Sequence, residues 1–460
     1  MFLRSCGVLS GGVLSLFLIS SCATYYHKNK VFNEAFEQRD LEAAHAFLEK
    51  KKNPEKKKDR FIHYLDKGML AHQLGNWEES NLYLEKAYIF GEDYKKNLGT
   101  DLGSTVDHGL VLYYGEYHEH LIPLYYKALN YLRLNDLDAS LVECRRLDIR
   151  LQELLDRSTS KKKYTRDAFI HTLMGILYEV KGEYNNSFIA YRNAYEIYRD
   201  VYGPVFKIKT PIQLKRDLLK TARMNGFEDE YLRLRKEMNF KEKIPEVESS
   251  LGDVVLLWNN GLCPIKDEYE VFFVFAPAAG GFYCRNLDML IPLPIGSVYQ
   301  GFESVRITFP KYLSRRPRYS RARVRTSSGK SYGFELLEDV NALSFYLLRE
   351  RMFKEISKVI LRVAAKELLE QEARKVNPWL GLGADILGSL TERSDTRGVQ
   401  TLPHSIFYTR ISLPAGVQKL DLSFHGKGAN AIRVEQSIEV ESQKTVLSYV
   451  TTIDSHAPSD

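Results

Sequence analysis

The sequence predicts an α+β protein in which an array of helical hairpins is followed by an antiparallel β-sandwich-like domain with one long inserted helix. Three observations lead to this fold class. Stretches of the first half share one internal spacing of small residues, apolar residues alternate with a period of two after Pro245, and one long amphipathic segment interrupts the β-rich half. A chain of 460 residues has room for roughly two to four domains.

The composition is that of an ordinary folded protein. Apolar residues make up 44% of the chain and charged residues 27%, and the 65 Lys and Arg against 59 Asp and Glu give a net charge of +6. These values exclude a disordered chain, a collagen-like chain and a protein with many membrane spans. Tyr is in excess, with 29 residues. A regular excess of Tyr indicates a repeated packing unit.

Residues 1–21 are predicted to be a lipoprotein signal peptide. Arg4 precedes an apolar run from Val8 to Ile19, which is shorter than the about 20 residues that span a bilayer. Small residues then precede Cys22, as in a bacterial lipobox, so we expect Cys22 to carry acyl chains such as palmitate. The alternative is an ordinary secretory signal followed by Cys22 without lipid. With Ala23 next, the sorting rule for this class favours the outer membrane, and residues 22–31 would form the lipid anchor and tether.

Three stretches of the first half are copies of one pattern. In residues 61–94 a small residue is followed by a turn residue after seven positions and by another core residue after nineteen, and residues 121–154 and 168–201 repeat these offsets. The three sets are Gly68, Gly75 and Ala87, then Ala128, Asn135 and Leu147, then Gly175, Gly182 and Ala194. Small residues let two helices approach closely, and Gly or Asn makes the turn between them.

This pattern resembles the tetratricopeptide repeat, a helix–turn–helix unit of 34 residues. The resemblance implies a helical repeat domain over residues 32–244, with degenerate copies near residues 37–50 and 211–244. A generic helical array is the alternative and changes little. Repeat arrays of this kind present a concave groove to a partner.

The second half is predicted to form a β-rich domain over residues 245–454, followed by a flexible tail at 455–460. Apolar or alternating runs between turn residues predict the strands. These strands are 253–258, 270–275, 304–309, 321–326, 331–336, 406–413, 417–424, 431–440 and 446–453. Between the two blocks of strands, apolar residues at steps of three and four predict a helix over about 338–376. Charged residues interrupt that helix, so it is not a membrane span.

The densest charge feature is a run of six Arg within eleven residues. It comprises Arg315, Arg316, Arg318, Arg321, Arg323 and Arg325. The last three alternate and therefore share one face of a strand. This run is a candidate patch for an anionic partner, and the alternative is a solvated strand edge that charge keeps soluble. Further along, Asp395 and Arg397 could form an ion pair that fixes their loop against the sandwich.

The remaining cysteines carry no catalytic or metal-binding pattern. Cys144, Cys263 and Cys284 stay in the mature chain, and Cys263 and Cys284 could either pair or remain two buried thiols. No CxxC pair, metal-ligand spacing or cofactor-binding fingerprint occurs. We therefore expect no metal, no cofactor and no nucleic-acid partner.

Four short motifs resemble an uncharacterised family of tetratricopeptide-repeat-containing lipoproteins of Gram-negative bacteria. They lie at residues 126–132, 143–146 and 260–266 and, in a split motif, at 395–397 with 401–403. The family usually carries a Trp in the last motif, where Val399 stands here. The resemblance covers roughly residues 25–425 and implies an envelope lipoprotein, but it implies no catalytic residues.

The first functional hypothesis is a non-enzymatic scaffold, anchored at the outer membrane and facing the periplasm, whose repeat groove holds an envelope protein. An enzyme acting on cell-wall or surface polymer is the alternative, with Asp267, Glu268, Asp395, Arg397 and His404 as its candidates. A third hypothesis is a lipoprotein that binds lipid or glycan through the Arg run. The sequence leaves the oligomeric state open.

Overall fold

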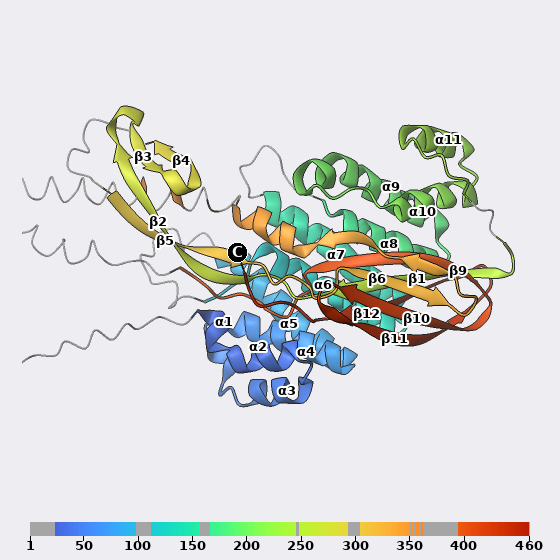
Figure 1. The fold of residues 1–460 in the computed structure, drawn as a ribbon, viewed down its shortest axis with the longest axis horizontal. Coiled ribbons are helices and arrows are strands. Elements are labelled where there is room, and N and C mark those ends of the chain that lie inside the picture. The colour runs from blue at the N-terminus through green and yellow to red at the C-terminus, as the bar shows by residue number, and fades with distance from the viewer. Residues whose placement is uncertain are drawn as a thin grey trace, which may run out of the picture.

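The computed structural model describes residues 24–97, 112–156, 166–244, 248–292, 304–349, 352, 356–357, 360–361 and 394–459. The predicted signal peptide and Cys22 lie outside these residues, as does the part of the predicted long helix at 362–376. The α+β class is confirmed, because helices fill the first half and strands the second (Figure 1). None of the described helices combines the length and apolarity needed to cross a bilayer.

The helical array is built from hairpins. Its elements are α1 (Tyr25–Lys28), α2 (Lys30–Glu37), α3 (Leu41–Glu49), α4 (Arg60–Leu74), α5 (Trp77–Asn97), α6 (Tyr117–Arg133), α7 (Leu137–Asp156), α8 (Ala168–Val180), α9 (Tyr184–Ile197), the π-helical segment η3 (Tyr198–Phe206), α10 (Ile212–Met224) and α11 (Glu228–Glu237). The helices α4, α6, α8 and α10 are the first helices of their hairpins, and α5, α7, α9 and α11 are the second helices.

The repeated small residues set the distance between the two helices of a hairpin. A Cβ atom built on Gly68 would lie 2.5 Å from the side chain of Leu84, and one on Gly175 would lie 2.4 Å from the ring of Tyr191. The turn residues Gly75, Asn135, Gly182 and Gly226 all have positive φ, which ends the first helix. The predicted spacing therefore corresponds to real close contacts.

A recurring serine adds one hydrogen bond to each of the three clear hairpins. It lies twelve residues after the small residue, and its hydroxyl donates to the carbonyl of that residue at 2.8 Å. The pairs are Ser80 with Gly68, Ser140 with Ala128, and Ser187 with Gly175. These identical bonds are evidence that the three hairpins are copies of one unit.

The strands form three four-stranded sheets. They are β1 (Leu251–Asn260), β2 (Ile265–Ala276), β3 (Gly281–Cys284), β4 (Met289–Pro292), β5 (Ser304–Leu313), β6 (Arg321–Thr326), β7 (Ser331–Gly333), β8 (Glu335–Asp339), β9 (Ser405–Pro414), β10 (Gly416–Gly426), β11 (Ala429–Val440) and β12 (Thr445–Thr452). We call the sheet β12-β1-β9-β8 the inner sheet, β11-β10-β6-β7 the outer sheet, and β4-β3-β2-β5 the distal sheet.

The inner and outer sheets pack face to face as a sandwich. Val254, Leu256 and Trp258 of β1 meet Leu422 and Phe424 of β10 in one apolar cluster. The expectation of an entirely antiparallel domain needs one correction, because β1 and β12 run parallel. A long connection separates these two strands in the chain, and only such a connection can bring two strands together in parallel.

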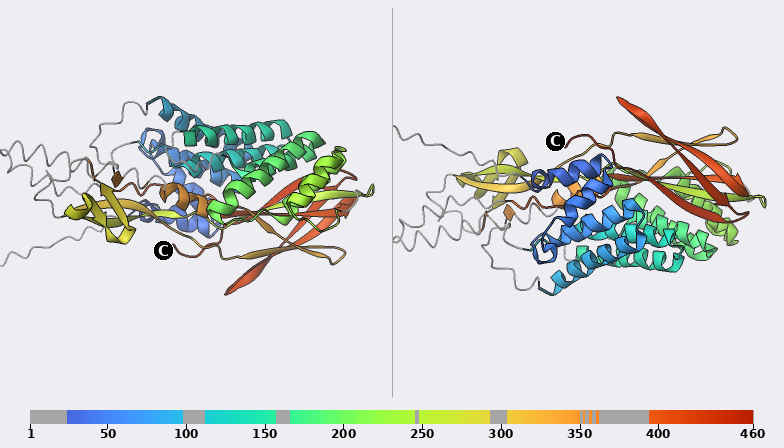
Figure 2. Two further views of the ribbon diagram at one scale, coloured as in Figure 1. Left: turned by 90° about the horizontal axis from the view of Figure 1, so that it is seen from above. Right: turned by 90° about the horizontal axis from the view of Figure 1, so that it is seen from below.

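The opposite face of the inner sheet lies on the helical array. Val255 and Leu257 point away from the sandwich and join the same apolar cluster as the array. At this contact the ring of His72 in α4 stacks on Tyr449 of β12 with centroids 5.6 Å apart, and the hydroxyl of Tyr125 in α6 donates to Asn259 at 2.8 Å. The molecule thus has three layers, the array, the inner sheet and the outer sheet (Figure 2).

This layering changes where a partner can bind. His72, Tyr125 and Glu179 contact the inner sheet from the first helices α4, α6 and α8, which line the groove in a repeat array of this type. Tyr191 of the second helix α9 also contacts this sheet, at Arg410. The groove expected to hold a partner is therefore occupied by strands of the same chain. The physical reason is the continuous apolar run from Val254 to Trp258 in β1, which places apolar side chains on both of its faces.

The distal sheet extends from the other layers toward one end of the molecule (Figure 1). One face carries Val271, Phe273 and Phe282, which pack with Ile356 and Ile360. Residues 340–349 and the described positions between 352 and 361 are helical, as predicted for the start of the inserted helix.

Both ends of the described chain form hydrogen bonds with distant segments. Tyr25, within the predicted tether, is buried in α1, and its backbone N–H donates to the hydroxyl of Thr396 at 3.1 Å. In the predicted tail, Ser459 exchanges backbone hydrogen bonds with Ser314 at 2.9 and 3.0 Å. In each case the segment pairs with residues far away in the sequence, so the local composition gives no sign of it.

Candidate functional site

The loop that carries Asp395 and Arg397 lies where the array, the inner sheet and the distal sheet meet. Arg397 donates to both carboxylate oxygens of Asp395, at 2.7 and 2.8 Å, so the ion pair is formed. The guanidinium of Arg397 also lies 5.1 Å from the ring centroid of Tyr113. The pair therefore connects its loop to the segment that precedes α6.

A buried carboxylate beside this loop fixes it to the array. Glu119, in the first turn of α6, accepts hydrogen bonds from the backbone N–H of Val399 at 2.6 Å and from the hydroxyl of Tyr113 at 2.7 Å. It also accepts from the N–H of Glu116 at 2.7 Å, which completes a capping box at the start of α6. Burial raises the pKa of Glu119, against the lowering effect of Lys266.

Lys266 of β2 supplies the cation of this cluster. Its ammonium forms a buried ion pair with Glu116 and donates to the hydroxyl of Tyr113 at 3.1 Å. We call Tyr113, Glu116, Glu119, Lys266 and Arg397 with Asp395 the junction cluster. The cluster joins three parts of the chain that are between about 130 and 280 residues apart, so its main effect is to hold these parts together.

Arg315 extends the same junction toward the N-terminal helices. It is 1% exposed, and its guanidinium donates to the carbonyl of Cys263 at 2.8 Å, to Glu37 at 2.9 Å and to the carbonyl of Gln400. This placement corrects the predicted patch, because Arg315 is a buried residue and cannot contact a partner with the other five. Its five donors suit a site with several acceptors.

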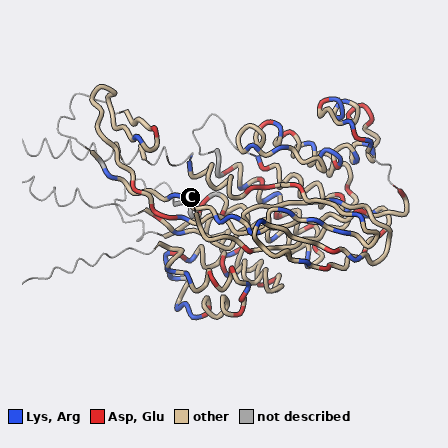
Figure 3. The backbone as a smooth tube through the Cα atoms, in the orientation of Figure 1, with Lys and Arg blue, Asp and Glu red and all other residues tan. Residues whose placement is uncertain are grey.

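The other members of the Arg run are exposed. Arg316 and Arg318 precede β6, and Arg321, Arg323 and Arg325 share the solvent face of β6 as the alternation predicts. The strand register places Arg325 opposite Asp421, and Arg323 opposite Ser423, whose other neighbour is Arg433. The positive charge is thus partly balanced at one end of β6, and the sandwich carries both basic and acidic positions (Figure 3).

The cysteines of the described region are unsuited to nucleophilic chemistry. Cys144, Cys263 and Cys284 are all free and buried, so Cys263 and Cys284 do not pair. Burial raises the pKa of the Cys263 thiol to about 11, although Arg315 acts to lower it. The thiol therefore stays protonated at neutral pH, while the reactive form of cysteine is the thiolate.

The residues considered for an enzyme each engage other groups of the chain. The backbone of His404 bonds to Asn260 and Asn341, and burial lowers the pKa of its imidazole. Asp267 accepts from the backbone N–H of Glu268 at 2.8 Å in β2, and Asp395 is engaged by Arg397. Across the described residues, no three His, Cys, Asp or Glu side chains gather so as to hold a metal ion.

A second buried charge cluster was not predicted from the sequence. Arg410 of β9 projects into the array, where it forms ion pairs with Glu179 of α8, with Asp217 of α10 at 2.9 Å and with Asp253 of β1 at 3.0 Å. Burial raises the pKa of Asp217 to about 6, even though Arg410 lowers it. The one sequence signal was an Arg within an otherwise apolar strand, and its partners are too distant in the chain to be inferred.

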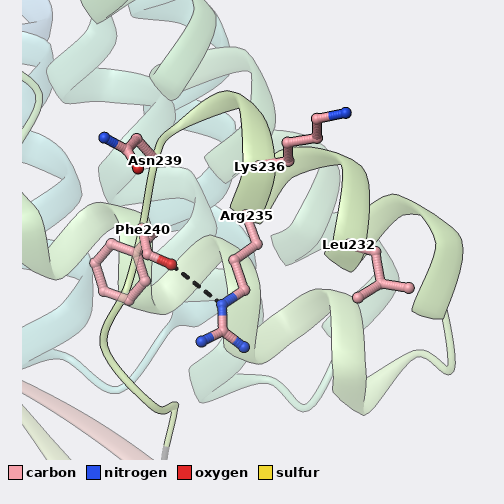
Figure 4. A pocket seen from close by; sticks show the side chains of 5 residues that line it. All are labelled: Leu232, Arg235, Lys236, Asn239 and Phe240. Carbon is pink, nitrogen blue, oxygen red and sulfur yellow. Dashed lines mark hydrogen bonds between the residues drawn. The ribbon is translucent and has the colours of Figure 1, made fainter.

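One surface hollow lies at the end of the array. Leu232, Arg235, Lys236, Asn239 and Phe240 line it. Arg235 donates to the carbonyl of Phe240 at 3.1 Å, and its guanidinium thereby closes the turn after α11 (Figure 4). The hollow is lined by the two cations Arg235 and Lys236 and by no carboxylate or imidazole.

The fold and the junction cluster define a class: a helical-hairpin array of tetratricopeptide-like design fused through its groove to a β sandwich. No known protein family matches the sequence, and no curated protein matches it. Membership of the lipoprotein family therefore stays a prediction.

Solved structures show a distant similarity to part of the chain. BtubC (BKLC) from P. vanneervenii is 14% identical over 48% of this chain and 82% of its own, with a TM-score of 0.29. MamA is 15% identical over 45% of this chain and 91% of its own, also with a TM-score of 0.29. A tetratricopeptide repeat protein from Parabacteroides merdae ATCC 43184 is 13% identical over 48% and 80%, with a TM-score of 0.20. The assignment of helical hairpins here rests on the geometry of this chain.

Proposed function

We propose that this chain is a lipid-anchored, non-enzymatic interaction protein of the Gram-negative cell envelope, attached to the outer membrane through Cys22. The observation that carries the proposal is the use of its buried polar groups. Glu119, Lys266 and Arg315 all bind other segments of the same chain. These buried polar side chains therefore hold the segments of the chain together. A partner would contact the exposed surfaces of the protein.

The partner surface is the outer side of the array. With the groove filled, the second helices remain open to solvent, and they carry an apolar side chain at the same repeat position. Leu82, Val142 and Ile189 each follow the turn residue by seven positions, and all three are exposed. Two helical turns after Leu82 and Val142, Ile89 of α5 and Ile149 of α7 are exposed as well. Repeated exposed apolar residues mark an interaction surface better than scattered ones.

A pull-down from solubilised membranes tests this proposal. The variant with Leu82→Ser, Val142→Ser and Ile189→Ser is compared with the parent and with a control. The control carries Val31→Ser and Val417→Ser, two residues outside the second helices that are even more exposed. We expect a specific partner with the parent and the control and at least a tenfold smaller yield with the triple variant. If the parent recovers no protein above background, the interaction role is contradicted.

The anchor has its own test. Palmitate-analogue labelling of cells should mark the parent and leave a Cys22→Ser variant unlabelled, and the parent should sediment with membranes. An unlabelled parent that stays in the soluble fraction would contradict lipid attachment without affecting the interaction test.

A further inference from the structure

The distal sheet exposes an unusual number of large apolar side chains on one face. Phe272 is 52% exposed, Val274 55%, Tyr283 38% and Leu290 39%. In the strand register Val274 is opposite Tyr283 and Tyr283 is opposite Leu290, so these three form a row across β2, β3 and β4. Phe272 lies two residues before Val274 and therefore on the same face. We call these four residues the distal apolar face.

The packing of the other face does not account for this pattern. Val271, Phe273 and Phe282 already bury the opposite face against Ile356 and Ile360. An antiparallel sheet with one solvent face normally alternates apolar and polar residues. Here both faces are apolar around the row, which indicates that the exposed face has an occupant of its own.

The border of the face is amphipathic. Arg306 is opposite Phe272 in the register, with its guanidinium 5.8 Å from the Phe272 ring centroid, and it forms an ion pair with Glu270. The hydroxyl of Tyr283 donates to Asp288 at 3.0 Å. A Phe and a Tyr beside an Arg whose stem can lie along apolar surface are the residue types found where proteins meet the headgroup layer of a bilayer.

The distal sheet also lies at the end of the molecule to which the chain is tethered. Helix α1 contacts β2, and both lie toward the same end of the long axis (Figure 1). Cys22 precedes the first described residue, Thr24, by two positions, which span about 7 Å when fully extended. Val274 is eight residues along β2 from Lys266 in the junction cluster, a distance of about 27 Å. A bilayer that holds Cys22 is therefore within reach of the distal apolar face.

We propose that the distal apolar face rests in the headgroup region of the phospholipid bilayer that holds the lipid anchor. This inference rests on the anchor of the proposed function and adds an orientation to it. The protein would then contact the membrane at two places, the acylated Cys22 and the row Val274, Tyr283 and Leu290. Several acyl chains on Cys22 already give durable attachment, so the row would fix the orientation of the protein on the membrane.

Fluorescence quenching by brominated lipid tests the contact. The full lipidated protein is reconstituted in vesicles of phosphatidylethanolamine and phosphatidylglycerol, with a Tyr283→Trp reporter in one sample and a Val417→Trp reporter in a matched one. Val417 is 69% exposed in the outer sheet and is not part of the distal sheet. After subtraction of the parent signal, we expect bromolipid to quench the Tyr283→Trp reporter at least twofold and the Val417→Trp reporter by less than a tenth.

The outcomes separate this inference from the proposed function. If the protein floats with the vesicles and both reporters are quenched equally little, the anchor stands and the membrane contact is overturned. If the parent does not float with the vesicles, the anchor fails and this inference fails with it.

A second copy of the chain is the competing occupant of the face. If the parent has the mass of a dimer in detergent and Phe272→Ser returns it to a monomer, the face belongs to that copy and the membrane contact is overturned. A monomeric parent whose Phe272→Ser variant melts at the same temperature and loses the quenching of the Tyr283→Trp reporter supports the membrane contact.

Discussion

At the scale of single residues, burial is the main cause of the shifted pKa of Asp66 in α4. Its carboxyl is almost fully buried and accepts a weak hydrogen bond from Thr401 at 3.4 Å. Burial raises the pKa of Asp66 to about 7, and the nearby Asp59 and Glu119 add to the effect while Lys51 opposes it. The ordinary value is 3.8. The folded protein therefore binds a proton at Asp66 over a pH range in which the unfolded chain has released it.

This gives a prediction for stability against pH. Because the folded pKa is above the unfolded one, the contribution of Asp66 falls as pH rises from about 4 to about 7 and is constant above that. Asp66→Asn removes the cost of holding an ionised carboxylate in the protein interior at high pH. We therefore expect the variant to be more stable than the parent at pH 8, by up to about 4 kcal/mol, and no more stable at pH 4. Urea unfolding at pH 4, 6 and 8 measures the difference. The exposed Asp229→Asn is the control, and an equal gain at all three pH values would refute the titration of Asp66.

A polar contact could be predicted from the sequence only when its two residues were close together in the chain. The pair of Asp395 and Arg397 was predictable, because the two residues are two positions apart and complementary in charge. The contacts of Glu119 with Val399 and of Lys266 with Glu116 were not, because 280 and 150 residues separate the partners. Arg315 shows the same limit, since its neighbours in the sequence are exposed and only the fold buries it.

At the scale of elements, the hairpins were predictable because their determinants are local. A small residue, a turn residue seven positions later and an apolar partner on the second helix together fix two packed helices. The three sheets were less predictable, because strand alternation identifies a strand without naming its neighbour. The continuous apolar run of β1 indicates burial on both faces, but it could not show that one of these faces would cover the array.

The close approach of the hairpin helices gives a second prediction. Ala normally stabilises a helix interior relative to Gly, by about 1 kcal/mol. At Gly175 the added methyl would lie 2.4 Å from the ring of Tyr191, which is fully buried and cannot move aside. We therefore expect Gly175→Ala to destabilise the protein by about 1–3 kcal/mol in urea unfolding.

The control for this substitution is Gly333→Ala in β7, where a Cβ atom would meet nothing within 4 Å. Its stability should stay within about 0.5 kcal/mol of the parent. If Gly175→Ala proves neutral or stabilising, then α8 and α9 are farther apart at Gly175 and Tyr191 than the contact distance of 2.4 Å indicates.

At the scale of the whole molecule, the array and the inner sheet share one apolar core. Residues of α4, α6, α8 and α10 lie in the same cluster as Val255, Tyr408 and Tyr449. The buried ion pairs of Arg410 cross the same contact. Neither layer can therefore expose its inner face without also breaking the core of the other.

We accordingly predict that the array and the sandwich unfold in one transition. Calorimetry of the full chain should give a single peak for both, with helix loss by far-UV circular dichroism coinciding with loss of the near-UV signal of the aromatic core. A single substitution at Arg410, such as Arg410→Met, should move this whole transition to lower temperature, because it leaves Glu179 and Asp217 buried without their partner. Two separated peaks, of which Arg410→Met shifts only one, would show that the layers are independent.

The parallel pairing of β12 with β1 has a consequence for how the protein is made. Asp253 of β1 pairs with Thr445 of β12, 192 residues later in the chain. The hairpins depend on local contacts and can form as soon as each has been made, whereas the strand that completes the inner sheet arrives almost last. Until then the inner faces of the hairpins, with His72 and Tyr126 among their aromatic side chains, have no cover. The strand that is made almost last is therefore the one that covers the aromatic faces of the helices that are made first.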